Sequence, residues 1–337
     1  MSCTVRILPY DKTYECEEGE TLLAAGIRSG FNLRFGCKHG GCGSCKVKVV
    51  EGEVDMDEGS SFALMDYEKD AGFALLCVAT AQEDVSIEVD ITEEELLEAP
   101  SQAVQDVRTT IEKIDTIARD IVAFRLKFDE GQKLSFRPGQ YVDLNVPGTD
   151  QWRSYSMAST AQDVRGLDFM LKISPGGLWS TYLTSKAQIG DPVELRGPFG
   201  SFYLREESSQ MVFVAGGSGL APVWAMLQQM RAECDARAAW LYFGARSAED
   251  LVYVEKLRRL EQELPNFHFI PALSEPEKTP GWTGEAGLVT EVLGRKQSSW
   301  MGTEGYLCGP PGMVDAAIRV LTERGVPVER IFFDKFV

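Results

Sequence analysis

The sequence has little basic charge for its size, and it lacks long apolar runs. Its 337 residues hold 34 lysines and arginines against 51 aspartates and glutamates, which gives a net charge of −17. Most of this charge lies in residues 1–100, where 8 basic and 21 acidic side chains give a net charge of −13. A protein of this charge is not expected to bind nucleic acid or an anionic membrane.

No segment looks like a membrane span or a signal peptide. The longest uncharged stretch, residues 208–230, contains three glycines, a proline and paired glutamines, so it predicts a strand, a loop and a helix. The first ten residues are short and mixed, and charged residues follow them. We therefore expect a cytoplasmic protein, in which the eight cysteines serve metal or redox chemistry and not disulfides.

The length and the 44% hydrophobic content suit two or three globular domains. We expect a first domain at residues 1–98, a linker at 99–105 where charge, proline and small polar residues coincide, a second domain at 106–206 and a third at 207–337. The first should contain strands near residues 5–8, 13–16, 46–50 and 85–91, with a helix from Thr21 that ends at Gly30.

The second and third domains differ in pattern. Short strands near residues 107–115, 121–128, 141–146, 168–173 and 192–196 predict a small antiparallel barrel. From residue 211 onward, strands (211–215, 238–243, 267–272, 305–308) alternate with helices (221–233, 252–264, 313–324), which predicts a doubly wound parallel sheet. The expected fold class is therefore multidomain, with an α/β third domain.

Four cysteines have the spacing of a metal-cluster site. Cys37, Cys42 and Cys45 form a C-x4-C-x2-C pattern in a glycine-rich loop, and Cys77 follows at a distance. This is the ligand spacing of a plant-type [2Fe–2S] cluster, whose glycines would allow positive φ angles and let amide groups face the sulfurs. Zinc is the alternative, but zinc sites favour paired C-x2-C spacings. A Rieske centre needs two histidine ligands. The cysteine loop contains His39, but the other histidine of the sequence, His268, lies in another domain.

This cysteine loop resembles that of plant-type ferredoxins. The resemblance covers residues 1–95 and implies a β-grasp fold and one-electron transfer. Cys3, Cys16 and Cys234 lack this spacing and are interpreted as inert side chains.

The second domain carries two short motifs suited to a flavin. Arg153, Tyr155 and Ser156 form an R-x-Y-S pattern that offers a guanidinium, an aromatic face and a hydroxyl. Further on, a strand ending near Lys172 leads to a glycine turn and a helix with Ser180 in its first turn, where backbone amides can bind phosphate. Taken alone, each motif is better explained by an ordinary barrel strand or an ordinary capped helix.

The third domain carries two glycine loops, each after a strand and before a helix. The first, Gly216-Gly217-Ser218-Gly219, has the position of a dinucleotide phosphate loop but not the G-x-G-x-x-G spacing. The second follows Cys308 as Gly309-Pro310-Pro311-Gly312.

Taken together, and in this order, these motifs resemble the ferredoxin–NADP reductase superfamily. The resemblance implies that Tyr155 packs on the isoalloxazine, that Arg153 and Ser180 hold the pyrophosphate, and that Ser156 lies near flavin N5. It also implies that Cys308 lies where nicotinamide meets flavin, and that Asp334 and Phe336 lie at the flavin, although plant reductases carry tyrosine where this chain has Phe336.

The candidate residues form two sets. The candidate catalytic residues are Ser156, Cys308, Asp334 and Phe336. The candidate cofactor-binding residues are Arg153, Ser154, Tyr155, Ser156, Lys172, Gly176, Gly177, Ser180, Gly216, Gly217, Gly219, Arg246, Cys308, Gly309, Pro310 and Phe336.

Coenzyme choice should be set near residues 244–253, after the second strand of the third domain. Glu249 and Asp250 disfavour a 2′-phosphate there, whereas Arg246 could bind one. The family resemblance favours NADH. The expected cofactors are a [2Fe–2S] cluster, FAD and NADH.

A ferredoxin fused to such a reductase resembles the electron-transfer components of bacterial multicomponent oxygenases. The resemblance favours the reductase of a benzoate- or toluate-type aromatic-ring dihydroxylating dioxygenase, with a Rieske-type oxygenase as partner. The alternative is the reductase of a diiron monooxygenase for phenol, toluene or methane. A non-catalytic iron–sulfur sensor is disfavoured by the intact flavin and nicotinamide motifs. We expect a monomer whose acidic N-terminal domain docks transiently on a basic surface.

Overall fold

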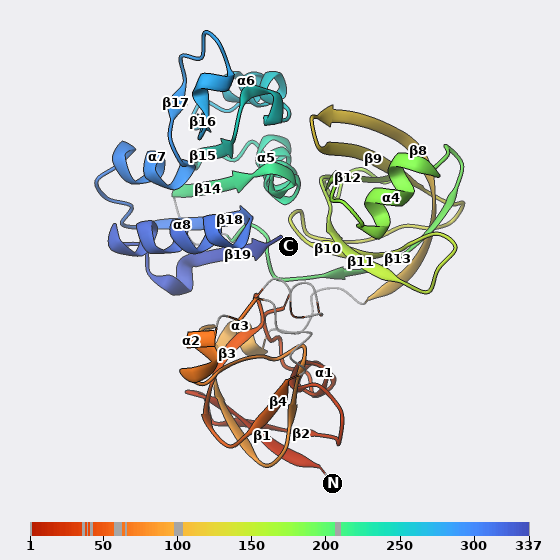
Figure 1. Ribbon diagram of the computed structural model, residues 1–337, viewed down its shortest axis with the longest axis vertical. Coiled ribbons are helices and arrows are strands. Elements are labelled where there is room, and N and C mark those ends of the chain that lie inside the picture. Colours follow the sequence, from red (N-terminus) through yellow and green to blue (C-terminus); the bar gives the residue numbers. More distant parts are fainter. Residues whose placement is uncertain are drawn as a thin grey trace. The chain divides into compact units, whose positions relative to one another are not determined.

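The computed structural model describes residues 2–35, 38, 40, 43–56, 63–64, 66–97, 104–205 and 210–336. The chain divides into two compact units, an N-terminal unit of residues 1–101 and a C-terminal unit of residues 102–336 (Figure 1). The linker expected at 99–105 falls mostly outside the described residues. Within the described ranges, no helix combines the length and the apolar character that a membrane span requires.

The N-terminal unit is built on a mixed five-stranded sheet with the order β2-β1-β7-β3-β5. Its elements are β1 (Cys3–Leu8), β2 (Lys12–Cys16), α1 (Leu22–Arg28), β3 (Lys46–Glu51), β4 (Val54–Met56), α2 (Asp66–Asp70), β5 (Phe73–Leu75), β6 (Ala79–Ala81), β7 (Val85–Glu88) and α3 (Glu93–Leu97). Helix α1 begins where the Thr21 hydroxyl accepts a hydrogen bond from the Ala24 amide at 3.3 Å. This arrangement is the expected β-grasp fold, although β7 ends three residues before the predicted Ile91.

The first half of the C-terminal unit is the expected antiparallel barrel. Its six strands have the order β11-β10-β13-β8-β9-β12. They are β8 (Gln105–Ala118), β9 (Ile121–Phe128), β10 (Tyr141–Asn145), β11 (Trp152–Ser156), β12 (Gly166–Lys172) and β13 (Pro192–Phe199), with helix α4 (Leu178–Ser185) before the last strand. Phe124 stacks between Phe169 and Trp179 at centroid distances of 5.0 and 5.6 Å, so Trp179 packs in the core of the barrel.

The second half is a parallel six-stranded sheet with the order β17-β16-β15-β14-β18-β19. Its elements are β14 (Gln210–Gly216), α5 (Leu220–Ala232), β15 (Ala238–Ala245), α6 (Val254–Glu263), β16 (Phe267–Leu273), β17 (Glu285–Ala286), α7 (Val289–Lys296), β18 (Thr303–Gly309), α8 (Pro311–Glu323) and β19 (Ile331–Lys335). The strand order reverses direction at β14, so a crevice between the carboxyl ends of β14 and β18 is the expected ligand site.

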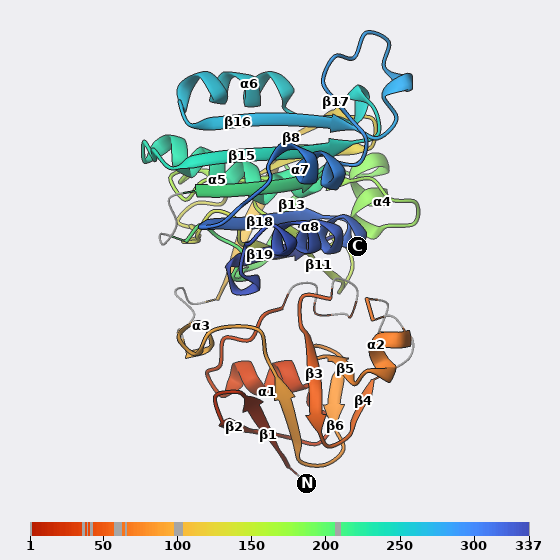
Figure 2. The same ribbon diagram turned by 90° about the vertical axis from the view of Figure 1, so that its left-hand side faces the viewer.

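The sheet of the second half is buried on both faces. Met211, Phe213 and Ala215 of β14 join a core with α5 and α6, whereas Val212 and Val214 join a second core with α7 and α8. Figure 2 shows α7 and α8 in front of this sheet. Burial on both faces explains the continuous apolar run that predicted β14. The sequence patterns did not predict α7, β17 or the edge strand β19.

Candidate functional site

Two of the four candidate cluster ligands lie within the described residues. Cys45 directly precedes β3 and Cys77 follows β5, and both side chains are buried. Strands β3 and β5 pair antiparallel with Lys46 opposite Leu75, and the Leu76 amide donates to the Cys45 carbonyl at 3.1 Å. This register brings Cys45 and Cys77 to the same end of the strand pair, although 32 residues separate them. Cys37 and Cys42 lie outside the described residues.

The described part of the cysteine loop has the backbone that a cluster site needs. Gly40 and Gly43 have φ angles of 77° and 74°, as expected, and Lys38 also has a positive φ of 59°. Left-handed residues at this density turn the chain tightly, so that amide groups can face an enclosed anionic group. Cys45 and Cys77 are buried thiols at the same end of two neighbouring strands, and the loop before Cys45 contains left-handed residues. Both features fit the thiolate ligand set of an iron–sulfur cluster.

Strand β11 presents the R-x-Y-S motif on two faces. Tyr155 pairs with the buried Val142 of β10 and packs edge-on against Trp179, with ring centroids 6.0 Å apart. Burial raises the pKa of Tyr155 above its usual range, so its ring is an uncharged stacking surface. Arg153 points to the same side as Tyr155 and is exposed, so its guanidinium is accessible to an anion.

The other face of β11 holds the two serines. Ser154 donates to the Asp143 carboxylate at 2.6 Å, and this bond ties β11 to β10. Ser156 is buried at the end of the strand, and its hydroxyl lies 3.4 Å from the Asp334 carboxylate of β19. The motif therefore reaches the second half of the C-terminal unit through Ser156.

The turn before α4 is suited to a phosphate group. Gly176 has a φ of 75°, and a side chain at this position would meet open space. Gly177 is the N-cap of α4 and provides no side-chain cap, so the first amides of the helix are available to an anion. The buried Ser180 hydroxyl accepts a hydrogen bond from the Ser174 amide at 3.0 Å, which fixes the turn. These features fit the pyrophosphate of FAD.

The glycine loop after β14 is packed on one side and open on the other. A side chain at Gly219 would come within 2.3 Å of the Cys308 carbonyl oxygen, and one at Gly216 within 2.8 Å of the Met313 sulfur. Gly217 has a φ of 58° and would meet nothing within 4 Å. The loop thus packs closely against β18 and leaves its Gly217 side accessible, as a dinucleotide phosphate requires.

Three of the four candidate catalytic residues converge at the carboxyl ends of β18 and β19. Cys308 of β18 pairs in register with Asp334 of β19, and Asp334 contacts Ser156. The Phe336 amide donates to the Gly309 carbonyl at 2.9 Å, so the fourth candidate continues the same strand pairing. Gly309 has a φ of 146° and Pro310 is the N-cap of α8, so the chain turns here from strand into helix.

The Cys308 thiol is held in its protonated form. Its side chain is fully buried, and burial together with the nearby charge of Asp334 raises its pKa well above the usual range. A neutral thiol beside a carboxylate and a serine hydroxyl forms a compact polar group where the two halves of the C-terminal unit meet. Such a group can orient a ring amide or a ring nitrogen without placing a second negative charge in the crevice.

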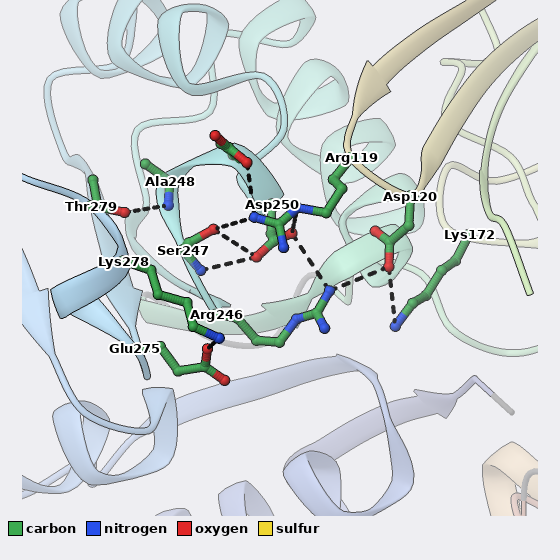
Figure 3. Close-up of polar contacts among 11 residues, drawn as sticks. Arg119, Asp120, Lys172, Arg246, Ser247, Ala248, Asp250, Glu275, Lys278 and Thr279 are labelled. Carbon is green, nitrogen blue, oxygen red and sulfur yellow. Dashed lines mark hydrogen bonds and ion pairs between the residues drawn. The ribbon is translucent and has the colours of Figure 1, made fainter.

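Arg246 and Lys172 both lie close to Asp120, a residue that the sequence patterns did not indicate. Arg246 lies just after β15, and its guanidinium is 3.6 Å from the carboxylates of both Asp120 and Asp250 (Figure 3). Lys172, at the end of β12, is exposed and has its amino group 3.8 Å from the same Asp120. Asp120 lies in the turn between β8 and β9, where a charged residue is unremarkable in the sequence, so no local signal marked it.

Three domain families match the chain along its length. Residues 5–82 match the 2Fe-2S iron-sulfur cluster binding domain. Residues 108–203 match the oxidoreductase FAD-binding domain, and residues 213–319 match the oxidoreductase NAD-binding domain.

Relatives of known role match nearly the whole chain. The reductase component of propane 2-monooxygenase from Mycolicibacterium smegmatis is 41% identical over 97% of this chain and 95% of its own length. The reductase component of phenol 2-monooxygenase from a Pseudomonas strain is 36% identical, covering 100% and 95%. The electron transfer component of toluate 1,2-dioxygenase from Pseudomonas putida is 34% identical, covering 96% and 94%.

A solved structure also matches nearly the whole chain. The cytochrome P450 reductase of Amycolatopsis superposes with a TM-score of 0.77 at 32% identity, covering 99% of this chain and 98% of its own.

Proposed function

Because the chain belongs to the family of reductase components that combine a [2Fe–2S] ferredoxin domain with FAD- and NAD-binding domains, we propose that it supplies electrons to a monooxygenase. Family membership makes it an NADH-dependent iron–sulfur flavoprotein oxidoreductase that serves an oxygenase. The type of oxygenase is the part that is proposed.

The three cofactors divide the chemistry between them. NADH supplies a hydride, FAD exchanges electrons in pairs or singly, and the cluster passes them on one at a time. The residues of the C-terminal unit serve the first exchange. The glycine loop after β14 and the start of α4 offer amides to two phosphate-bearing cofactors, while Ser156, Cys308 and Asp334 line the place where their rings would meet.

The identity of the relatives supports a monooxygenase partner. Reductase components of propane 2-monooxygenase from four organisms are 38–41% identical to this chain, against 34% for the toluate 1,2-dioxygenase component at nearly equal coverage. The aromatic-ring dioxygenase with a Rieske-type partner, which the motifs favoured, is therefore the second candidate.

The partner assignment is testable with the purified chain and the oxygenases of its own genome. With the monooxygenase we expect one NADH and one O₂ consumed per hydroxylated product, with water as the other product. The proposal is wrong if the chain instead reduces a Rieske centre, seen by electron paramagnetic resonance, faster than it supports the monooxygenase.

The charge of the N-terminal unit supports transient electrostatic docking. Residues 1–100 carry a net charge of −13, and residues 101–337 only −4. A basic surface on the oxygenase would be the complement, and such steering weakens with salt because the Debye length shortens. We propose that the chain acts as a cytoplasmic monomer that docks in this way, since its cysteine ligands need a reducing compartment.

Stopped-flow electron transfer across ionic strength tests the docking. We expect the rate to the oxygenase to fall by about tenfold between roughly 20 and 300 mM salt. Transfer from flavin to cluster within the chain is the control and should stay constant. A salt-independent intermolecular rate would leave the acidic unit without this role.

A further inference from the structure

Two consecutive residues of opposite charge join the barrel to the nicotinamide half. Arg119 and Asp120 form the turn between β8 and β9. The Arg119 guanidinium lies 2.9 Å from the Glu249 carboxylate, and the Asp120 carboxylate lies 3.6 Å from the Arg246 guanidinium. Arg119 also lies 3.5 Å from the Asp250 carboxylate, so the turn contributes both a cation and an anion to ion pairs with the loop that follows β15 (Figure 3).

The loop after β15 is held in one conformation. The Ser247 amide and hydroxyl both donate to the Asp250 carboxylate, at 3.0 and 2.9 Å, and the Asp250 amide donates back to the Ser247 carbonyl at 3.1 Å. Arg119 adds a hydrogen bond to the Ser247 hydroxyl at 3.1 Å. Burial would raise the pKa of Asp250, but these bonds and the two nearby guanidinium groups hold it below its usual range. Asp250 is therefore a permanent negative charge beside Arg246.

Asp120 is the second charge on Arg246, and the turn that carries it is anchored. Its backbone carbonyl accepts a hydrogen bond from the Ile173 amide at 2.7 Å, which ties the turn to the segment after β12. Its carboxylate is 27% exposed, whereas the Arg246 side chain is 54% exposed. Arg246 can thus reach a ligand, but two carboxylates share its charge before a ligand arrives.

This location matters for coenzyme choice. In doubly wound sheets, the residues just after the second strand face the adenosine ribose, where an acid suits a 2′-hydroxyl and an arginine suits a 2′-phosphate. Here Arg246 stands after β15, which lies beside the strand that carries the glycine loop. A 2′-phosphate would bring a charge of about −1.5 to −2 to a site where Asp120 and Asp250 already occupy the cations Arg119, Lys172 and Arg246.

We propose that Asp120, a residue of the flavin barrel, sets the preference for NADH by pairing with Arg246. In this pair, Arg246 is not available to bind a 2′-phosphate. NADPH would have to separate this pair, and the phosphate would then face the released carboxylate. NADH presents a neutral hydroxyl and leaves the pair intact. This specificity device rests on the NADH dependence of the family and is independent of the oxygenase partner.

The substitution Asp120→Asn removes the charge and keeps the size of the side chain. In the flavin-loaded protein, we expect calorimetry to show that 2′,5′-ADP binds about tenfold more tightly than to wild type, a gain of about 1.4 kcal/mol, with 5′-AMP changing far less. The ratio of kcat/KM for NADPH to that for NADH, measured with ferricyanide, should rise by a similar factor. Ferricyanide accepts electrons without an oxygenase, so a wrong partner assignment would not affect this result.

Asp106→Asn is the matched control. Asp106 likewise pairs with an arginine, Arg196, at 2.6 Å, but it lies at the start of β8, at the end of the strand away from the β8–β9 turn. It should leave both nucleotide affinities at their wild-type values. An equal gain in the control would mean that overall charge, and not the pair with Arg246, determines the affinity for 2′,5′-ADP.

Arg246→Ala completes a double-mutant cycle. In wild type it should barely change 2′,5′-ADP binding, because Arg246 is already paired; in the Asp120→Asn background it should remove the whole gain. The proposal is wrong if Asp120→Asn leaves 2′,5′-ADP binding unchanged. It is also wrong if affinity for 2′,5′-ADP and 5′-AMP falls equally, since the pair would then only hold the two halves together.

Discussion

The two units of the chain hold their redox groups by different means. In the N-terminal unit, the proposed ligands Cys45 and Cys77 are buried thiols at one end of the β3–β5 pair, where they are suited to bind iron directly. In the C-terminal unit, the sites consist of backbone amides at helix starts and of side chains from distant strands. A cluster bound by four covalent ligands should fail when one ligand is lost, whereas a site made of many weaker contacts should weaken in steps.

The largest effect is expected from Cys77→Ser. Loss of one thiolate should remove the [2Fe–2S] signal in electron paramagnetic resonance and abolish most one-electron transfer to cytochrome c. NADH oxidation by ferricyanide should continue, because the C-terminal unit is intact. Cys16→Ser is the control, since that buried thiol donates to the Glu20 carbonyl, as a hydroxyl also could. A normal cluster signal in Cys77→Ser would contradict the ligand assignment.

A smaller, graded loss is expected from Asp334→Asn. The carboxylate contacts Ser156 and contributes to the raised pKa of Cys308, so its loss should disturb the alignment of the two rings. We expect kcat for NADH–ferricyanide activity to fall about tenfold to a hundredfold with little change in KM. The cluster signal should be unaffected. Asp315→Asn removes the carboxylate that pairs with Lys335 of the same strand, so it controls for losing a paired negative charge beside β19; an equal loss there would remove the specific role of Asp334.

The smallest expected effect is a change in stability, measured by removing one ion pair from each unit. Lys335 is 7% exposed and lies 2.8 Å from the Asp315 carboxylate, whereas Lys12 and Glu93 form a similar contact on the surface. Lys335→Met should lower the stability of the C-terminal unit by about 1–2 kcal/mol, because it removes the partner of Asp315. The loss should not be larger, because Asp315 remains partly solvated. Lys12→Met should change the N-terminal unit by less than about 0.5 kcal/mol.

Thermal unfolding can separate the two units in that experiment. Flavin release reports the C-terminal unit, and bleaching of the cluster absorbance reports the N-terminal unit. Equal shifts for the two variants would show that burial does not distinguish these pairs.

Local patterns predicted most of the elements and the identity of many candidate residues. The apolar run at β14 predicted a strand because both of its faces are buried, and the glycine loop after it predicted a turn into a helix. The pattern was uninformative for β19. Its five residues, Ile331–Lys335, mix charged and aromatic side chains because they form an edge strand.

The sequence by itself determined the family, the three-domain order and the ligand types, because cysteine spacing and glycine loops are local requirements of a cluster and of a phosphate. Only the tertiary structure decided which distant residues meet. Ser156 and Asp334 are 178 residues apart and come within 3.4 Å because the barrel packs against the carboxyl ends of the parallel strands. Asp120 meets Arg246 for the same reason. A charged residue in a turn has no local signature of its partner, since that partner is chosen by the packing of two separate sheets.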